Sequence, residues 1–409
     1  MKRAARWLPV CAALLALLPW VPGLDGNFAR SLLSQMGIAA IFAISYNLLL
    51  GQTGLLSFGH AVYFGLGGYA AIHLLRAVNG GVPIPVAFVP LAGALTGLAA
   101  GIVVGSVATR RAGTIFALIT LGVGELVHAA SLMLPAFFGG EEGITASRTR
   151  APPFLGLDFG SQLQVYYVIA SWLLTSAFLA LAFMRTPVGR MCNAVRDNPE
   201  RAEFMGYNPR RVRFIACSVS AMLAGLAGGL HAINYEIVTS EAVGAMRSGE
   251  VLLMVYIGGV HHFIGAIVGA VAITWLQVSL SSYTSAWLLY LGLFFMAIIL
   301  YAPGGLAAIL VQHAAIWRAR AMGGVLRAYA LALPAALMMV GGAVTLLEIA
   351  YRLSTQPEAG AHMTLFWISM NAATPWPWLG AAAVALAGFL LLRRVAPRVR
   401  AAWDLALDG

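Results

Sequence analysis

The chain has 409 residues, of which 60% are hydrophobic and only 10% are charged. A soluble domain carries about 25% charged residues, so this composition excludes a soluble enzyme and predicts an all-α, polytopic transmembrane helical bundle. The net charge of +10 does not indicate a nucleic-acid partner, because the arginines stand in short loops between apolar segments. The three cysteines fit neither a metal site nor a disulfide framework, and we expect no metal and no cofactor.

Apolar segments of about 20 residues are needed to cross a bilayer. On this criterion we expect ten spans in a core at residues 1–310 and two more in a C-terminal extension at residues 311–409. Because no convincing cleavage site follows the first segment, we expect it to be retained. The expected spans are Leu8–Leu24, Arg30–Leu50, Gly54–Leu75, Pro85–Ala108, Gly113–Pro135, Gln162–Met184, Arg213–Tyr235, Glu250–Val260, Phe263–Ser281, Ala286–Leu310, Tyr329–Ala350 and Trp376–Leu392.

Twelve crossings place both termini on one side, which we expect to be the cytoplasmic side because most loop arginines fall there. Those arginines lie at residues 110–111, 185–213, 318–327 and 393–400. The outer side receives Arg30, Arg76, Arg148, Arg150, Arg247 and Arg352. The short segment Glu250–Val260 is the weak point of this topology, since a re-entrant segment there would invert everything that follows.

The stretch Gln52–Ala71 is apolar but contains five glycines. Glycine costs a helix roughly 1 kcal/mol per residue, so the glycines indicate close helix packing or a break that lines a cavity. Gln52, Ser57 and His60 add polar atoms at its cytoplasmic side. We interpret the stretch as a packing and pathway helix; the alternative is a glycine-rich packing helix without a pathway role.

Small residues recur at every fourth position in three of the other spans, a spacing that lets two helix backbones approach closely. We interpret this pattern as ordinary packing within a tight bundle, without information about a substrate. The residues concerned are Gly93, Gly97, Gly101 and Gly105, then Ala221, Gly225 and Gly229, and finally Gly265 and Gly269.

The longest charged segment is the loop at residues 185–213, with seven arginines against three acidic residues. Asn198 is a good N-cap for a short helix, Pro199–Met205, which Gly206 ends. We expect a turn at Gly189–Val195 before it, while Asn208 caps the next span with Pro209 at its first position. The short helix suits docking to a soluble partner, with Phe204 and Met205 as apolar contacts; the alternative is a loop that only sets topology and meets anionic membrane lipid.

Ionisable residues inside apolar spans are candidates for function, because a charge in the bilayer is costly. Glu125 lies mid-span, and His128 is on the same helix face three residues later. The pair either lines a pathway or gate, or forms an internal contact between helices. Glu250 begins a span and has an interfacial position as its alternative.

Two alternatives of another class stay open. One is an ion-coupled secondary transporter or channel that uses Glu125 and His128, and the other is an integral-membrane enzyme that uses Glu125 or the pair His261 and His262. The chain contains no G-x-x-x-x-G-K-S/T motif, so we expect no ATP site of its own. We also find no catalytic constellation.

Several blocks between about Arg30 and Leu310 together resemble the LivM-type permease subunit of ABC importers. They are QTGLLSFGH from Gln52, TLGVGELVH from Thr120, EVLLMVYIGG from Glu250 and APGGL from Ala302. The loop adds R-T-P-x-G-R, A-x-R-D-N and A-x-x-x-G patterns. Their positions here are Arg185, Pro187, Gly189, Arg190, Ala194, Arg196, Asp197, Asn198, Ala202 and Gly206.

This resemblance implies a permease of the bacterial inner membrane for branched-chain or related amino acids. It implies as partners a second, LivH-type permease subunit, two cytoplasmic ATP-binding subunits and a periplasmic substrate-binding protein. The loop would couple to the ATPase, through Arg190, Arg196, Asp197, Asn198, Glu200, Ala202, Glu203, Phe204 and Gly206. The translocation pathway would include Gln52, Ser57, His60, Glu125, His128 and Glu250.

The sequence also departs from the family pattern. His128 stands where the family commonly has arginine, Gly139–Ile144 replaces its T-G-G-S/T-D-G-I/L block, and His261 and His262 replace small or polar residues. The extension at residues 311–409 lies outside the pattern. These departures concern the substrate more than the transport role.

Overall fold

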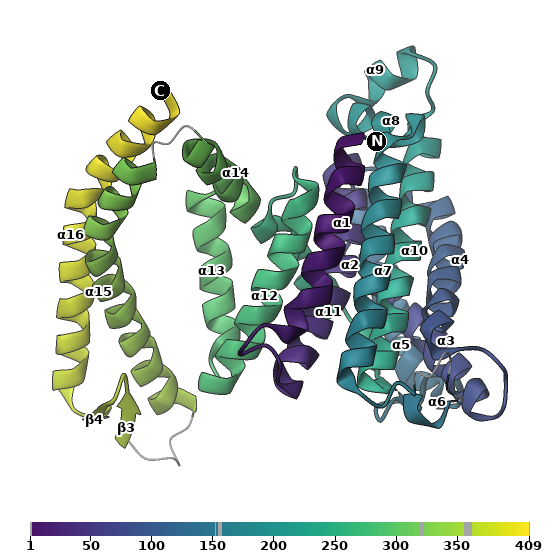
Figure 1. The fold of residues 1–409 in the computed structure, drawn as a ribbon, viewed down its shortest axis with the longest axis horizontal. Helices are drawn as coiled ribbons and strands as arrows, with labels where there is room; N and C mark the ends of the chain where they lie inside the picture. The colour runs from purple at the N-terminus through teal and green to yellow at the C-terminus, as the bar shows by residue number, and fades with distance from the viewer. Residues whose placement is uncertain (1, 152, 154–157, 319–321, 356–361, 409) are drawn as a thin grey trace. The chain divides into compact units, whose positions relative to one another are not determined.

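The computed structural model describes residues 2–151, 153, 158–318, 322–355 and 362–408. It contains two compact units, Met1–Tyr283 with Leu291–Ala308, and Thr284–Tyr290 with Ile309–Gly409 (Figure 1). The helices are α1 (Lys2–Leu17), α2 (Asn27–Thr53), α3 (Ala61–Asn79), α4 (Pro90–Ala108), α5 (Thr114–Met133), α6 (Pro135–Phe138), α7 (Gln162–Arg185), α8 (Pro187–Asp197), α9 (Pro199–Phe204), α10 (Pro209–Tyr235), α11 (Ala245–Gly258), α12 (Phe263–Tyr283), α13 (Trp287–Tyr301), α14 (Gly305–Arg318), α15 (Met322–Thr355) and α16 (Pro375–Asp408).

The expected all-α, polytopic architecture is confirmed. Among the described residues, nine helices are long and apolar enough to cross a membrane, and α13 with α14, bent by 53°, counts as a tenth if the pair is one span. The sequence predicted twelve crossings. Two of the expected segments are shorter, because the apolar part of the first covers Val10–Trp20 and α11 has only 14 residues.

The first unit is built around α10, which packs against α2, α3 and α4. Glycines allow these contacts: a Cβ atom at Gly93 would lie 2.4 Å from the backbone oxygen of Gly225, and one at Gly97 would lie 2.3 Å from that of Ala221. A Cβ atom at Gly228 would lie 1.7 Å from the backbone oxygen of Phe64 on α3. The close packing predicted from the small-residue spacing is therefore confirmed.

Two helices of 27 residues, α2 and α10, end in the same way. Gly54 follows α2 with φ of 69°, and Glu236 follows α10 with φ of 58°, so each helix stops at a left-handed residue. A segment outside the α-helices comes next, and then the shorter helix α3 or α11. The starts of these shorter helices meet, since the backbone N–H of Ala61 donates to Ser248 Oγ at 2.9 Å.

This arrangement corrects two expected spans. The span expected at Gly54–Leu75 begins only at Ala61, because residues 54–60 leave the helix. The span expected at Glu250–Val260 begins at Ala245 and ends at Gly258. The glycine-rich stretch therefore contains a helix break as well as close packing.

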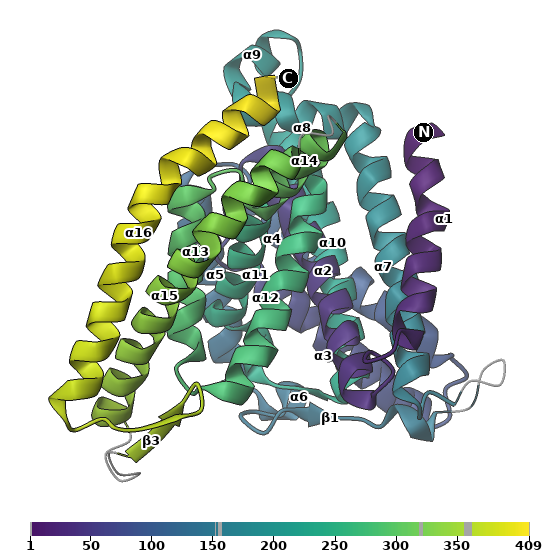
Figure 2. The same ribbon diagram turned by 60° about the vertical axis from the view of Figure 1, so that its left-hand side comes forward.

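A small antiparallel sheet lies at one end of the first unit, beside the end of α10 (Figure 2). Its strands β1 (Ile144–Thr145) and β2 (Ile237–Val238) pair Ile144 with Val238. Arg148 fastens the neighbouring end of α10: its Nη1 donates to the backbone oxygens of Ile233 and Asn234, each at 3.0 Å, and its backbone N–H donates to Glu236 Oε1 at 2.6 Å. Arg148 thus binds the last carbonyl groups of the helix, which have no partner within it.

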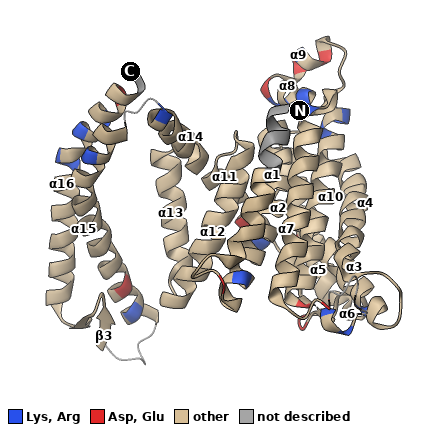
Figure 3. Ribbon diagram, in the orientation of Figure 1, with Lys and Arg blue, Asp and Glu red and all other residues tan. Residues whose placement is uncertain are grey.

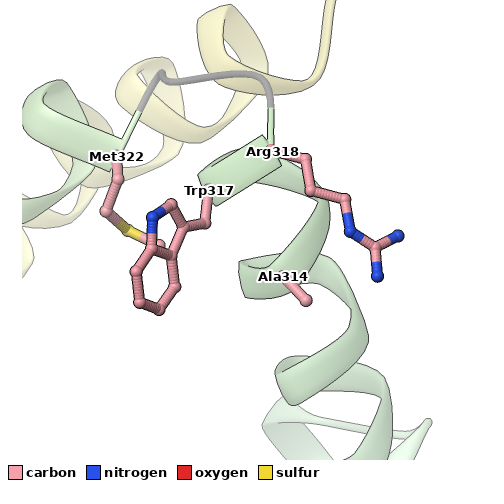
Figure 4. Close-up of a pocket in the computed structure, with 4 residues that line it drawn as sticks. All are labelled: Ala314, Trp317, Arg318 and Met322. Carbon is pink, nitrogen blue, oxygen red and sulfur yellow. The ribbon is translucent and has the colours of Figure 1, made fainter.

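In the second unit, α15 packs along α16, and the hairpin β3 (His362–Leu365) and β4 (Ile368–Asn371) lies between them in the chain. Tyr329 joins the helices at one end, because its hydroxyl accepts from Trp403 Nε1 at 2.9 Å and lies 3.1 Å from His313 Nε2. An open pocket in this unit is lined by Ala314, Trp317, Arg318 and Met322 (Figure 4). The spans expected at Tyr329–Ala350 and Trp376–Leu392 are parts of longer helices, and residues 356–361 of the loop between them lie outside the described residues.

Candidate functional site

Two short helices, α8 and α9, join α7 to α10 at one end of the first unit (Figure 1). The starts of α8, α9 and α10 each have a side-chain cap. Thr186 Oγ1 accepts from the N–H of Gly189, Asn198 Oδ1 from that of Arg201 at 2.9 Å, and Asn208 Oδ1 from that of Arg210 at 3.0 Å. The caps predicted at the two asparagines are confirmed. The short helix ends one residue earlier than predicted, at Phe204, and the expected turn at Gly189–Val195 is the helix Pro187–Asp197.

A buried apolar cluster holds this loop against the membrane helices. Ala202, the one buried residue of α9, joins it with no measurable exposure. Gly189 lets α8 approach α7 closely, because a Cβ atom there would lie 2.1 Å from the backbone oxygen of Phe183. The members of the cluster are Cys192, Val195, Ala202, Val212 and Ala216, with Phe183 and Met191 packed against them. The loop is therefore fixed to the ends of α7 and α10.

The outer surface of the loop is polar except at its tip. The side chain of Phe204 is 91% exposed, and Met205 beside it is 55% exposed. Other exposed positions of the loop are Arg190, Asp197, Asn198, Glu200, Arg201, Glu203 and Gly206. Charged residues of the first unit gather at this end and at the opposite end around α6 (Figure 3). Phe204 is therefore an exposed aromatic side chain on an anchored helix, next to the exposed residue Glu203.

Cys192 provides a chemical test of this anchoring. Burial raises the pKa of its thiol to about 12, and the thiolate is the reactive form. We expect N-ethylmaleimide at about pH 8 to modify Cys192 in the folded chain at least about 1,000-fold more slowly than in chain unfolded in sodium dodecyl sulfate. Peptide mass spectrometry would follow each cysteine separately. Equal rates in the folded and unfolded chain would contradict the buried cluster.

Arg196, one of the predicted coupling residues, directs its guanidinium toward α2. Its Nη1 donates to the backbone oxygen of Gly51 near the end of α2, and its Nε lies 2.9 Å from Asp197 Oδ1. Its side-chain stem crosses Gly54, where a Cβ atom would lie 3.0 Å from Arg196 Cγ. The loop is thus joined to the helix that precedes the break.

Three of the predicted pathway residues are buried around that break. Gln52, Ser57 and His60 are at most 4% exposed. The Tyr46 hydroxyl donates to the backbone oxygen of Ser57 at 2.9 Å. His60 Nε2 lies 3.0 Å from Ser45 Oγ, and its ring packs against the side chains of Phe42, Tyr46 and Tyr63. These contacts hold α2 against the start of α3.

The other three lie elsewhere. Glu125 is on the exposed face of α5 and makes no hydrogen bond or ion pair with another described residue. His128 does not pair with it: His128 Nδ1 donates to the backbone oxygen of Ser240 at 3.2 Å. Glu250 Oε2 accepts from Arg247 Nη1 at 2.7 Å, and the Arg247 guanidinium lies 4.9 Å from the ring centre of Phe64. The pathway role of all six residues stays a prediction.

Sequence reasoning missed what Arg148, Thr120 and Ser248 do. Arg148 was assigned only to an outer loop, because a loop arginine is interpreted first as a topology signal. Thr120 Oγ1 accepts from the backbone N–H of Phe58 at 3.2 Å, as Ser248 does from Ala61. A single hydroxyl in an apolar span carries no signal of its partner, so these contacts depend on the tertiary structure.

The chain is similar in sequence to several known membrane permease proteins. The chain is 27% identical over 292 residues to the high-affinity branched-chain amino acid transport system permease protein LivM of Escherichia coli strain K12, covering 66% of this chain and 67% of LivM. It is 26% identical over 247 residues to the probable branched-chain amino acid transport permease protein LivH of Methanocaldococcus jannaschii, covering 57% of this chain and 73% of that protein. The autoinducer 2 import system permease protein LsrC of Shigella flexneri is 28% identical over 285 residues, with 67% of this chain and 78% of LsrC covered.

No solved structure matches the chain significantly. The model of the family described as branched-chain amino acid transport system / permease component matches residues 28–303, from the start of α2 to just past the end of α13. This match covers more than half of the chain and includes α8, α9 and the two helix pairs that are separated by a break, α2 with α3 and α10 with α11. The chain therefore belongs to this family of multi-pass membrane permease components.

Proposed function

We propose that the chain is a permease subunit of an ABC importer for branched-chain or related small amino acids. The observation that carries the proposal is the anchored loop: α9 presents Phe204 to solvent while Ala202 and the cluster around it fix the helix to α7 and α10. A loop built in this way can receive a force from a soluble partner and pass it to membrane helices.

The driving force comes from separate ATP-binding subunits, because the sequence contains no P-loop motif. Two such subunits, a second LivH-type permease and a periplasmic substrate-binding protein complete the assembly. The binding protein delivers the solute to the outer opening. Closure of the ATPases then moves α8 and α9, and the bundle opens inward. This chain makes and breaks no covalent bond in that cycle.

The pathway runs along the exposed face of α5. A carboxylate in the middle of a span is costly against lipid, and Glu125 lies on such an exposed face. Cover by the second permease, with a polar pathway between the two subunits, removes that cost. Gln52, Ser57 and His60 support the neighbouring helix break from behind, while Glu250 is paired with Arg247.

We place the importer in the bacterial inner membrane, with both termini in the cytoplasm. The start of α1 lies at the same end of the first unit as α8 (Figure 1), which supports this placement for the N-terminus. The arginines at this end of α7 and α10 agree with the positive-inside rule. The extension at residues 311–409 is an addition to the permease core in this proposal.

Reconstitution tests the function directly. The chain would be purified with its neighbouring subunits in mild detergent, placed in liposomes with the binding protein, and supplied with labelled leucine. We expect uptake that requires ATP and that stops when the P-loop lysine of the ATPase is replaced. Uptake by this chain alone, driven by a pH gradient, would overturn the proposal and favour the ion-coupled alternative with Glu125 and His128.

A further inference from the structure

The ends of α2 and α10 share a feature beyond their left-handed cap residues. Each receives an arginine from a distant loop on its last carbonyl groups: Arg196 binds Gly51 at the end of α2, and Arg148 binds Ile233 and Asn234 at the end of α10. A cation at a helix C-terminus interacts favourably with the helix dipole. The two sites lie at opposite ends of the first unit (Figure 1), one before each segment that interrupts the α-helices.

At α2 the arginine belongs to the loop that carries α9. Arg196 follows directly on the buried Val195, so its backbone is fixed by the apolar cluster. Its side chain is 27% exposed and is held at three places, by Gly51, by Asp197 and by van der Waals contact over Gly54. Any displacement of α8 therefore acts on the last turn of α2.

The last two turns of α2 are also in contact with the chain just after α11. Asn47 Nδ2 donates to the backbone oxygen of Val260 at 2.8 Å, and a Cβ atom at Gly51 would lie 2.5 Å from the same oxygen. With this close packing, the turn cannot move without moving the connection between α11 and α12.

Beyond Gly54, the non-helical segment reaches α5 and α11. The N–H of Phe58 donates to Thr120 Oγ1, and a Cβ atom at Gly59 would lie 1.9 Å from the backbone oxygen of Thr120. The next residues lead to the bond between the N–H of Ala61 and Ser248 Oγ. The chain of contacts from α8 therefore reaches Thr120, which lies on the same helix as Glu125.

We propose that Arg196 is a positioning residue that transmits movement of the coupling loop to the segment Gly54–His60 and so to α5 and α11. This inference rests on the proposed function, since it assigns how the loop's movement reaches the pathway. It predicts that Arg196 acts within this chain, not by contact with the ATPase.

The first measurement needs only this chain. We expect Arg196→Gln, in detergent, to raise the rate of amide hydrogen exchange at Phe58 and Ala61 by about tenfold or more, because the end of α2 loses its cross-link and opens locally more often. Phe204→Ala on the neighbouring helix should leave these rates unchanged. Arg148→Gln is the matched control, since it removes the corresponding arginine at α10 and should raise exchange only in residues 236–244.

The second measurement uses the reconstituted importer. For Arg196→Gln we expect copurification of the ATPases and ATP hydrolysis within about twofold of the original, with leucine uptake at least about tenfold lower. Arg196→Lys should recover part of the uptake, because lysine restores the charge but not the geometry of two bonds. A structural role alone would lower hydrolysis and uptake together.

Three outcomes would overturn the inference. They are unchanged exchange at Phe58 and Ala61, unchanged uptake despite faster exchange, and loss of ATPase association, which would make Arg196 a docking residue. An original importer that takes up no leucine contradicts the proposed function instead, because the exchange measurement requires neither nucleotide nor solute.

Discussion

Replacement of Gly228 by alanine is expected to destabilise the chain more than any other single methyl group at a helix contact. The added Cβ atom would lie 1.7 Å from the backbone oxygen of Phe64 and 2.9 Å from the backbone nitrogen of Gly68. Both neighbours are backbone atoms of α3, so no side-chain rotation relieves the clash and the two helices must separate. We expect a loss of about 3 kcal/mol, the upper end of the range for overpacked cores.

Thermal unfolding of the purified chain in detergent would measure this loss, as a fall of roughly 5 °C in the midpoint. Gly122→Ala, on α5, is the matched control, because an added Cβ atom there would meet no heavy atom within 4 Å outside the neighbouring backbone of its own helix. Alanine is favoured over glycine inside a helix by about 1 kcal/mol, so the control should unfold at the same or a slightly higher temperature. Equal midpoints for Gly228→Ala and the original chain would refute the direct backbone contact of α3 with α10.

The second large effect is expected at the tip of the coupling loop. Phe204→Ala removes an aromatic side chain that is 91% exposed in this chain, so the unfolding midpoint should not change. Buried aromatic anchors at interfaces contribute about 2 kcal/mol or more. We therefore expect affinity for the ATPase subunit to fall by about 30-fold, and leucine uptake by the reconstituted importer to fall with it.

Phe178→Ala provides the comparison, since Phe178 is a half-exposed phenylalanine on α7 and belongs to a membrane span. It should leave ATPase binding and uptake unchanged. Glu203→Arg, which reverses one charge beside Phe204, should weaken binding in the same direction as Phe204→Ala. Full uptake with both loop variants would show that α9 is not the coupling helix.

Patterns that depend on neighbours along the chain were predicted well. The N-caps at Asn198 and Asn208 follow from side chains that bond to backbone groups two or three residues away, and the structure contains both. Hydropathy located the long spans because each consists of about 20 consecutive, mostly apolar residues. Glycines at every fourth position indicated close packing, because this spacing puts them on one face of a single helix.

Prediction failed where a distant backbone completes the contact. Gly54–Leu75 was expected to be one span. The break at its start was not predicted, because the hydroxyls that accept hydrogen bonds from its backbone N–H groups belong to Thr120 and Ser248, which are far away in the sequence. The spacing of Glu125 and His128 was interpreted either as a polar pair that lines a pathway or as an internal contact between helices, and it did not reveal their partners. In the structure, His128 bonds to the 3-10 helix η4 (Ser240–Val243) and Glu125 lies exposed, so the pathway role of both stays a prediction.

Composition, hydropathy and caps thus specified a bundle of membrane helices with an exposed charged loop, since these signals arise within one or two helical turns. Which glycines face each other, where α2 and α10 break, and which carbonyl groups receive Arg148 and Arg196 were decided only when distant segments packed together. The physical reason is that a broken helix in a membrane needs partners for its backbone groups, and those partners come from other helices.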